Sequence, residues 1–468
     1  MLKTDIKVLD AQLEFEYLKN RTPLKFGAVI VEGCTYCTAK VKVENGRGQI
    51  ATGTGGGAVA DAWSYPSKRY GHAERDPMLR AAAELYRDKL AAHVGFAHPI
   101  DTIMELEPEL KGIGAEIERR FALVEAFPFL AVLVAMAPLD AALHDAFGLV
   151  NGIDTYAGYG SEHMADDLSR HLGPGFKGKY PGDYLHPRFK PKMPLFHLVG
   201  ALDKLTSAEL DAEDPQDGLP VSLDQWIAKE GLHCLKVKLV GNDVAWDVQR
   251  ILDVDAVARK ALGQSRSAEI AYSVDTNEQC GSPEYCVEML ERVRNARPEA
   301  FDAILYVEQP TERDLGHSRH DMRKLGAMKP VIIDESLTSQ SAFDLAVELG
   351  WSGVAMKTGK GHTASLMFLA RASELGMPYA VQDLTLPRFA YLHSLGFAAR
   401  IDTMLGVEGN GRQYQPLASD VERTLHAEAF DPVRGEVSTV SMRGPGLGLR
   451  LAEIEKISSG QKPPRVSV

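Results

Sequence analysis

Apolar and polar residues follow a repeated rhythm between residues 233 and 357. Five short apolar runs each end in a charged residue, and amphipathic stretches of helical spacing separate them. The terminal charges are Lys238, Asp275, Glu308, Asp334 and Lys357. Continuous apolar runs separated by helices are typical of parallel strands in repeated strand–helix units. The pattern predicts a parallel β/α sheet, and in a closed barrel the five charges would meet at one rim.

The same reading gives the other elements of the chain. Strands of the barrel are expected at 193–199, 233–239, 269–275, 304–308, 330–334, 353–357, 378–382 and 401–407. Before the barrel, residues 5–17 and 28–52 alternate like antiparallel strands, with a hairpin signal at Asn45-Gly46 and a polar loop at 21–25. Residues 74–126 predict helices. An α+β region therefore precedes a β/α barrel.

Three segments lack the strand and helix periodicity of the rest of the chain. Gly53-Thr-Gly-Gly-Gly57 lacks the ending of a phosphate-binding loop, so we interpret it as a loop of another kind. Residues 160–192 are rich in Gly, Pro and basic residues and predict an insertion, which covers the barrel rim, contacts another subunit or is a plain surface excursion. Residues after about 412 predict short elements and a polar tail.

The ordered motifs Lys236-Val-Lys238, Asp275-Thr-Asn277, Glu308-Gln-Pro310, Asp334-Glu-Ser336 and Lys357 resemble the enolase superfamily. Within it they look most like the muconate lactonizing enzyme subgroup of the mandelate racemase/muconate lactonizing enzyme family. The resemblance covers roughly residues 20–412. It implies a modified TIM-type barrel of (β/α)7β form with an α+β N-terminal capping domain. The expected parts are a cap at 1–130, a barrel at 131–411 with the 160–192 insertion, and a segment at 412–468 that returns to the cap.

The three carboxylates Asp275, Glu308 and Asp334 would repel one another at one rim, so a positive group is expected among them. Hard oxygen ligands with open positions suit Mg²⁺, and Mn²⁺ also fits. The alternative is an internal salt-bridge network without metal. The resemblance implies a metal ion on these three residues, with Glu335 and Asn277 directly behind the ligands.

Lysines flank the carboxylates on both sides. Lys236 and Lys238 share one face of their strand, because successive side chains alternate, and the apolar residues beside them suit the helix layer. Both lysines should therefore point into the barrel, where burial, the neighbouring cation and a metal would lower a lysine pKa. Lys238 and Lys357 could then act on opposite faces of a substrate's α-carbon, and Lys236 would bind its carboxylate or tune Lys238.

The resemblance implies removal of an α-proton from a carboxylate through an enediolate that a divalent cation stabilises. The expected enzyme is a racemase, epimerase or cycloisomerase. A hydroxy-acid or acid-sugar dehydratase (a lyase) and a catalytically inactive metabolite-binding barrel are the alternatives. The strand-six position holds Lys357 and strand seven ends in Gln382-Asp383, which disfavours the His/Asp pair of mandelate racemase. The Asp-x-Asp motif of dipeptide epimerases is absent.

Substrate contacts are expected from Glu408, at the end of strand eight, and from Tyr65 and Arg69 in a loop over the barrel mouth. Asp383 would bind a cationic or hydroxylated substrate or be structural. The loops around 21–26 and 53–76 are expected to select the substrate. Lys360 and His362 are interpreted as surface or loop residues.

Composition and net charge indicate which classes of binding partner to expect. The 468 residues are 45% hydrophobic and 25% charged, as in soluble globular proteins, and the net charge of −12 argues against nucleic acid. We expect no transmembrane run and no signal peptide, and hence a cytoplasmic protein. The expected partner is a small carboxylate substrate, and the resemblance implies a homo-oligomer.

Overall fold

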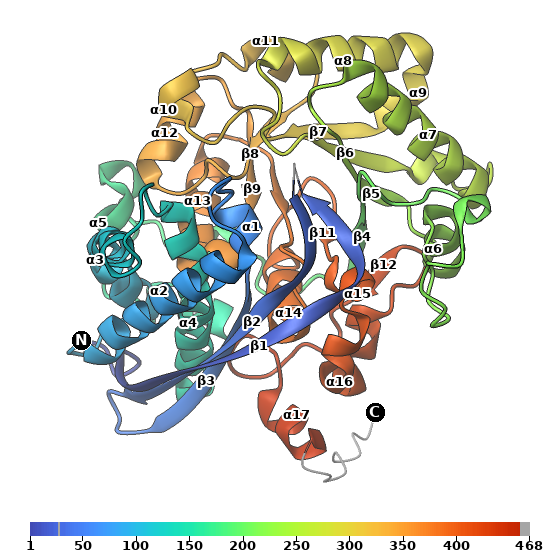
Figure 1. The fold of residues 1–468 in the computed structure, drawn as a ribbon. Helices are drawn as coiled ribbons and strands as arrows, with labels where there is room; N and C mark the ends of the chain where they lie inside the picture. The colour runs from blue at the N-terminus through green and yellow to red at the C-terminus, as the bar shows by residue number, and fades with distance from the viewer. Residues whose placement is uncertain (27–28, 459–468) are drawn as a thin grey trace.

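The computed structural model describes residues 1–26 and 29–458 and consists of a barrel and a cap (Figure 1). Eight parallel strands close into the barrel, because β11 pairs with both β10 and β4. The barrel strands are β4 (Lys192–Val199), β5 (Cys234–Lys238), β6 (Ala271–Asp275), β7 (Ile304–Glu308), β8 (Val331–Ile333), β9 (Gly353–Met356), β10 (Tyr379–Val381) and β11 (Val407–Glu408). The predicted β/α barrel is confirmed.

The last strand differs from its prediction. It occupies only Val407–Glu408, whereas the sequence pattern predicts 401–407. Gly406 precedes it with φ of 62°, in the left-handed region, and a Cβ there would lie 2.0 Å from the Pro194 carbonyl oxygen. The chain therefore turns sharply against β4 before it can enter the barrel.

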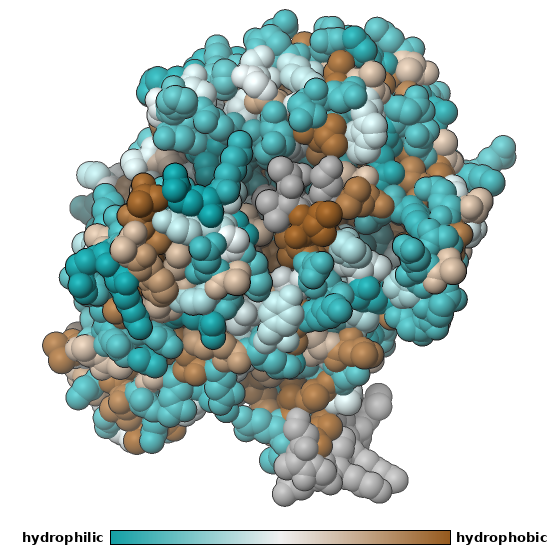
Figure 2. All heavy atoms as spheres, in the orientation of Figure 1, coloured by the Kyte–Doolittle hydropathy of each residue, from teal (hydrophilic) through white to brown (hydrophobic). Residues whose placement is uncertain are grey.

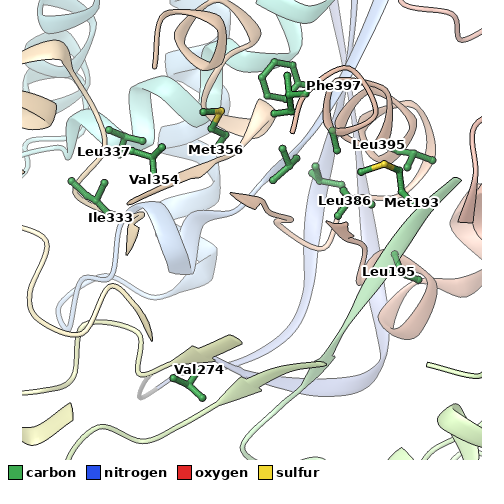
Figure 3. Close-up of a cluster of buried hydrophobic side chains, with 14 of the residues drawn as sticks. Met193, Leu195, Val274, Ile333, Leu337, Val354, Met356, Leu386, Leu395 and Phe397 are labelled. Carbon is green, nitrogen blue, oxygen red and sulfur yellow. The ribbon is translucent and has the colours of Figure 1, made fainter. Parts of the chain in front are cut away.

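Helices surround the barrel, because each strand exposes an apolar face outward. In β5, Leu235 and Val237 are fully buried in the hydrophobic core, and Lys236 faces inward, where it pairs with Glu308. Figure 3 shows part of this shell, including Val274, Val354 and Leu395. The helices are α6 (Leu223–Glu230), α7 (Val244–Leu262), α8 (Pro283–Ala296), α9 (Pro298–Ala303), α10 (Leu315–Ser318), α11 (Arg323–Gly326), α12 (Gln340–Glu348), α13 (His362–Glu374) and α14 (Arg388–Ala398), with short 3-10 turns at Ser207–Glu209, Ser267–Glu269 and Thr358–Lys360.

The cap is a three-stranded antiparallel sheet with four helices. Its elements are β1 (Ile6–Phe26), β2 (Val29–Asn45), β3 (Ile50–Val59), α1 (Asp61–Ser64), α2 (His72–Ala92), α3 (Pro99–Arg120) and α4 (Phe129–Asn151). The polar loop expected at 21–25 is wrong, because β1 continues through it after an irregularity between Lys19 and Leu24. Figure 2 shows a mostly hydrophilic surface whose hydrophobic atoms gather near the end of the β1–β2 hairpin.

The glycine run is also not a loop. Gly53–Gly57 lie inside β3, which pairs with β2 and packs on α4. A Cβ on Gly53 would lie 2.2 Å from the Ala146 nitrogen, and one on Gly55 would lie 2.1 Å from the Pro138 carbonyl oxygen. These glycines permit a sheet and a helix backbone to touch, so they serve packing and not substrate selection.

Helix α4 is long and apolar enough to cross a membrane, contrary to our expectation that the chain has no such run. Within the fold, 94% of its most apolar stretch is buried. It packs on β2 and β3 and joins the cap's hydrophobic core, so it is a core helix.

The predicted insertion and the C-terminal segment lie on the outside of the barrel. A 3-10 turn at Thr155–Gly158 precedes the insertion, which contains short helical turns at Ser169–Leu172 (α5), Pro174–Phe176 and Pro181–Tyr184. Lys179 and Tyr184 bind Glu374 at the end of α13. The C-terminal elements are α15 (Gly411–Tyr414), a 3-10 turn at Pro416–Ser419, α16 (Asp420–Phe430), β12 (Glu436–Ser438) and α17 (Leu451–Ser458). β12 pairs antiparallel with β4, and α15 contacts β1.

Candidate active site

A cavity of about 760 Å³, open solvent at its mouth included, lies between the cap and the carboxyl ends of the barrel strands. Its charged lining is Asp61, Lys236, Lys238, Lys357, Asp383 and Glu408. Its apolar lining includes Leu24, Trp63, Leu198 and Leu384. This mixture of apolar walls and a few converging charges is typical of small-molecule sites. Among the residues described, none from 160–192 lines the cavity, so the insertion does not cover the site.

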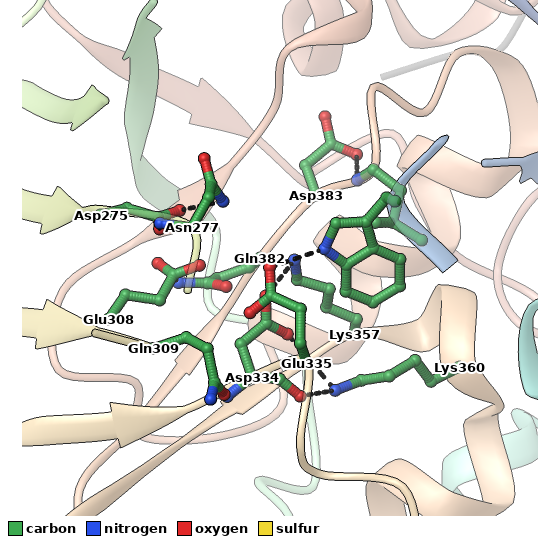
Figure 4. Close-up of polar contacts among 12 residues, drawn as sticks. Asp275, Asn277, Glu308, Gln309, Asp334, Glu335, Lys357, Lys360, Gln382 and Asp383 are labelled. Atoms are coloured by element: carbon green, nitrogen blue, oxygen red, sulfur yellow. Dashed lines mark hydrogen bonds and ion pairs between the residues drawn. The ribbon is translucent and has the colours of Figure 1, made fainter. Parts of the chain in front are cut away.

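The three predicted carboxylates meet at the rim. Asp275 and Glu308 end β6 and β7 and are register partners, and Asp334 directly follows β8. All three side chains are at most 1% exposed. Figure 4 shows them reaching from neighbouring strands toward Lys357. Burial, followed by the charge of Asp275, raises the pKa of Glu308 well above its ordinary value.

Lys236 lies among the carboxylates. Its Nζ is 2.8 Å from Glu308 Oε1, 3.2 Å from Glu408 Oε2 and 3.3 Å from Asp275 Oδ2. Burial works to lower the pKa of Lys236, but these carboxylates outweigh it and raise the pKa well above the ordinary value. Lys236 therefore remains a cation and holds neighbouring negative charges together.

The two predicted bases lie at opposite ends of the carboxylate row. Lys238 Nζ is 2.5 Å from Asp275 Oδ2, and Lys357 Nζ is 2.6 Å from Asp334 Oδ2. Burial works to lower the pKa of Lys357, but the charge of Asp334 raises it. Here the attraction of a buried carboxylate outweighs desolvation. The lowered lysine pKa, which we expect with a metal ion bound to Asp334, stays a prediction.

Lys360 was not expected at the site but belongs to it. It is 3% exposed, and its Nζ donates to the Asp334 carbonyl oxygen at 2.8 Å and lies 3.3 Å from Asp334 Oδ1. The 3-10 turn Thr358–Lys360 after β9 folds the side chain back toward β8. His362 is also buried, within a network that joins it to Tyr159 and His393. A surface location is thus wrong for both. For Lys360, only its spacing of three residues from Lys357 could have suggested otherwise.

Strained loop residues fix the carboxylates. Asn277 has φ of 46°, its backbone N–H donates to Asp275 Oδ1 at 2.7 Å, and its side-chain amide donates to Asp275 Oδ2 at 3.2 Å. Gln309 has φ of 30°, and its Oε1 accepts from the Asp334 backbone N–H at 2.9 Å. Left-handed backbone in non-glycine residues gathers at functional sites. Gln382 donates to Glu308 Oε2.

Glu335 connects the rim to the cap. Its Oε1 accepts a hydrogen bond from Trp63 Nε1 at 2.9 Å, and its Oε2 has no hydrogen-bond partner among the described residues. Burial and then the charge of Asp334 raise the pKa of Glu335 to about 8. A carboxyl with this pKa can exchange a proton near neutral pH.

The four expected substrate contacts have different surroundings. Glu408 lines the cavity and accepts from Asn410 Nδ2 at 2.6 Å. Asp383 also lines it, but both its oxygens accept backbone N–H groups, of Leu386 and Asn410 among others, so its role there is structural in part. Burial, then Glu408, raises the pKa of Asp383 to about 7.

The other two candidates do not line the cavity. Tyr65 is buried inside the cap, with its ring 5.4 Å from that of Phe127. Arg69 is exposed. In place of these two, the cap presents Trp63, which the sequence pattern did not single out.

The donor chemistry at the rim fits a divalent cation. Three buried carboxylate groups crowd together, and burial and then the charge of Asp275 raise the Glu308 pKa. A divalent cation would relieve the repulsion among these carboxylates. Among the described residues, however, no three His, Cys, Asp or Glu side chains are already arranged as a cation site. The lysine ammonium groups occupy that space as the partners of these carboxylates.

Comparisons with known proteins agree with this architecture. Residues 220–455 match the family described as Enolase C-terminal domain-like. The L-Ala-D/L-Glu epimerase of Bacillus subtilis has a similar structure, with a TM-score of 0.59, 17% identity and coverage of 94% of this chain and 98% of that chain. No curated protein sequence matches.

Two further solved structures share the fold. A muconate lactonizing enzyme of Pseudomonas fluorescens gives a TM-score of 0.57 at 16% identity, over 94% of this chain and 95% of that one. A dipeptide epimerase of Enterococcus faecalis, in complex with Mg and a dipeptide, gives 0.53 at 15% identity, over 86% and 90%. Because the family model matches half of the chain, within the barrel and the C-terminal segment, the chain belongs to the enolase superfamily, in the mandelate racemase/muconate lactonizing enzyme group.

Proposed function

We propose that this protein is a Mg²⁺-dependent enzyme that removes the α-proton of a small carboxylate, as a racemase, epimerase or cycloisomerase. One observation carries the proposal: Lys238 and Lys357 line the same cavity from opposite sides of the carboxylates. Lys238 ends β5 and Lys357 follows β9, and the strands β6, β7 and β8 lie between them. Two lysines placed in this way can address opposite faces of one carbon. A protein that only bound a metabolite would have no need of two opposed bases.

The three lysines of the site would have different roles in proton transfer. One of the two lysines, in its neutral form, takes the α-proton, and the other, in its protonated form, returns a proton on the opposite face. In a cycloisomerase only one lysine would act on the proton, and the other would supply positive charge. Lys236 holds the charges of Glu308 and Glu408 in place, and its raised pKa makes it an electrostatic group and not a base.

Asp275, Glu308 and Asp334 would hold the metal ion, with Glu335 and Asn277 beside them. Bound there, Mg²⁺ or Mn²⁺ would stabilise the negative charge of an enediolate and offset the carboxylate charge that keeps the Lys357 pKa high. With substrate bound, the cavity's apolar walls and the cap would shield the reacting carbon from water, which would strengthen these interactions.

The similar structures support an isomerase over a lyase, because their names include epimerases and a lactonizing enzyme. At sequence identities of 15–17%, these structures show only a shared fold. The specific reaction must therefore be argued from the residues of the site. Strand eight ends in Val407-Glu408 and lacks the acidic motif of dipeptide epimerases, which disfavours a dipeptide substrate. We further propose that the protein is a homo-oligomer, as the family resemblance implies, and that it is cytoplasmic.

Proton abstraction can be tested without knowing the substrate. The protein is incubated with Mg²⁺ in D₂O and a library of chiral and achiral carboxylic acids, and deuterium at the α-carbon is read by mass spectrometry. Exchange would establish proton abstraction and identify the acid class. Absence of both exchange and any new product over the whole library would contradict the proposal and favour the binding-only barrel.

A further inference from the structure

Trp63 of the cap lies against the Lys357 side of the site. Its ring centroid is 4.5 Å from Lys357 Nζ, and its indole N–H donates to Glu335 Oε1 at 2.9 Å. Trp63 is 6% exposed and lines the cavity. A single side chain from the cap therefore contacts a proposed base and the carboxyl next to a proposed metal ligand, both on the barrel.

The position of Trp63 is itself fixed by the barrel. Its carbonyl oxygen accepts a hydrogen bond from Arg313 Nη1 at 3.0 Å. Arg313 is held by Glu278 through two hydrogen bonds of 2.7 and 2.5 Å, a bidentate pair. On the cap side, α1 is anchored because Asp61 accepts from Arg75 Nε at 2.9 Å. These contacts hold the backbone that carries the indole, and the bond from its N–H to Glu335 holds the ring itself.

A lysine needs such support, because its ammonium is a point charge on a flexible four-carbon stem. Asp334 fixes one direction for Lys357 Nζ, and the electron-rich face of the indole attracts the same cation from another side. Two attractions from different directions define one position, whereas Asp334 alone would leave the ammonium free to rotate about it.

We propose that Trp63 is a positioning residue that holds Lys357 at one face of the substrate's α-carbon, so that the cap controls the Lys357 half of the reaction. The inference rests on the proposed function for its catalytic consequence. Its structural part, the placement of Lys357 by the indole, can be tested separately.

The first test uses no substrate. Acetic anhydride labels lysine side chains, and mass spectrometry compares acetylation of Lys357 with that of Lys238 in the same molecule. We expect Trp63→Leu to raise the Lys357/Lys238 labelling ratio at least threefold, because the ammonium is released, and Trp63→Phe, which keeps a ring, to stay within twofold of wild type. Trp246→Leu, on helix α7 outside the site, is the matched control and should leave the ratio unchanged. An unchanged ratio in Trp63→Leu would overturn the placement.

The second test uses the separated enantiomers of any chiral acid that exchanges. Trp63→Leu should lower kcat for exchange of one enantiomer at least tenfold, with KM within twofold, and leave the other enantiomer within twofold. Trp63→Phe should restore most of the lost rate. Equal losses for both enantiomers would mean that Trp63 only stabilises the cap, and no loss would mean that Lys357 needs no support. If wild type exchanges nothing, the labelling ratio still decides the placement, and the proposed function fails separately.

Discussion

Lys357 and Asp334 form a buried ion pair, with Nζ and Oδ2 2.6 Å apart, on the rim of the barrel. The carboxylate best placed as the third metal ligand is thus also the group that holds a proposed base. Asp334 further accepts from Lys360, so two ammonium groups share it. Any change in the charge of Asp334 should therefore change the pKa of Lys357.

Replacement of Lys357 by Ala should abolish net turnover, at least 10³-fold in kcat, because general-base groups contribute roughly 10²–10⁴-fold. Fold and Mg²⁺ affinity should be preserved, since Asp334 keeps Lys360 as a partner. Deuterium exchange measured on separate enantiomers should persist for the one whose proton faces Lys238. Retained turnover would remove Lys357 from the chemistry.

Asp275→Asn should weaken Mg²⁺ binding at least tenfold, because an amide replaces a charged oxygen ligand while the hydrogen bond from the Asn277 backbone N–H can be kept. Calorimetric titration of the substrate-free protein measures the affinity directly. The control is Asp402→Asn, a surface carboxylate that pairs with Lys190 and should have no effect. Equal affinities in wild type and Asp275→Asn would mean that the metal binds elsewhere.

Stability should fall as the pH drops from about 6.5 to about 4, in part because of buried histidines. Burial lowers the pKa of His393 to about 4, so the ring is neutral in the folded protein. In the unfolded chain the ring takes up a proton below its ordinary pKa of about 6.5, so acid favours unfolding. A shift of this size is worth about 2 kcal/mol between pH 7 and 4.5.

Urea unfolding of wild type and His393→Gln at pH 7 and pH 4.5 tests whether His393 contributes to this loss of stability. The variant should be less stable at pH 7, since it loses its bond to His362, but its loss between pH 7 and 4.5 should be smaller by about 2 kcal/mol. His320→Gln should lose as much as wild type. An identical loss in His393→Gln and wild type would show that another group titrates.

Gly55→Ala should destabilise the cap by about 1–3 kcal/mol, the usual effect of forcing a methyl group into a filled core. The added Cβ would lie 2.1 Å from the Pro138 carbonyl oxygen, so β3 and α4 would have to separate. Thermal unfolding measures the change. Gly175→Ala, where a Cβ would meet nothing within 4 Å, should be neutral, and equal melting temperatures for the two variants would contradict the packing argument.

The sequence by itself determined the barrel and the positions of its charged strand ends. Strand periodicity depends on local side-chain alternation, and the carboxyl ends of parallel strands must converge, so the pattern alone places Lys236, Asp275 and Glu308 on one rim, where the structure has them. The same local reasoning failed at the glycine run, because a glycine needed for close packing and a glycine needed for a turn look alike in sequence.

Only the tertiary structure decided what surrounds these charges. Trp63 is distant from Lys357 along the chain and lies in a one-turn helix without periodic signal, and it comes to face the lysine because the cap closes over the barrel. Lys360 is buried because a 3-10 turn aims it at Asp334, and the pKa of Lys357 is raised because that carboxylate is 2.6 Å away. Such contacts and the charges they bring together are set by packing between elements that are separate in the sequence, which local residue patterns do not encode.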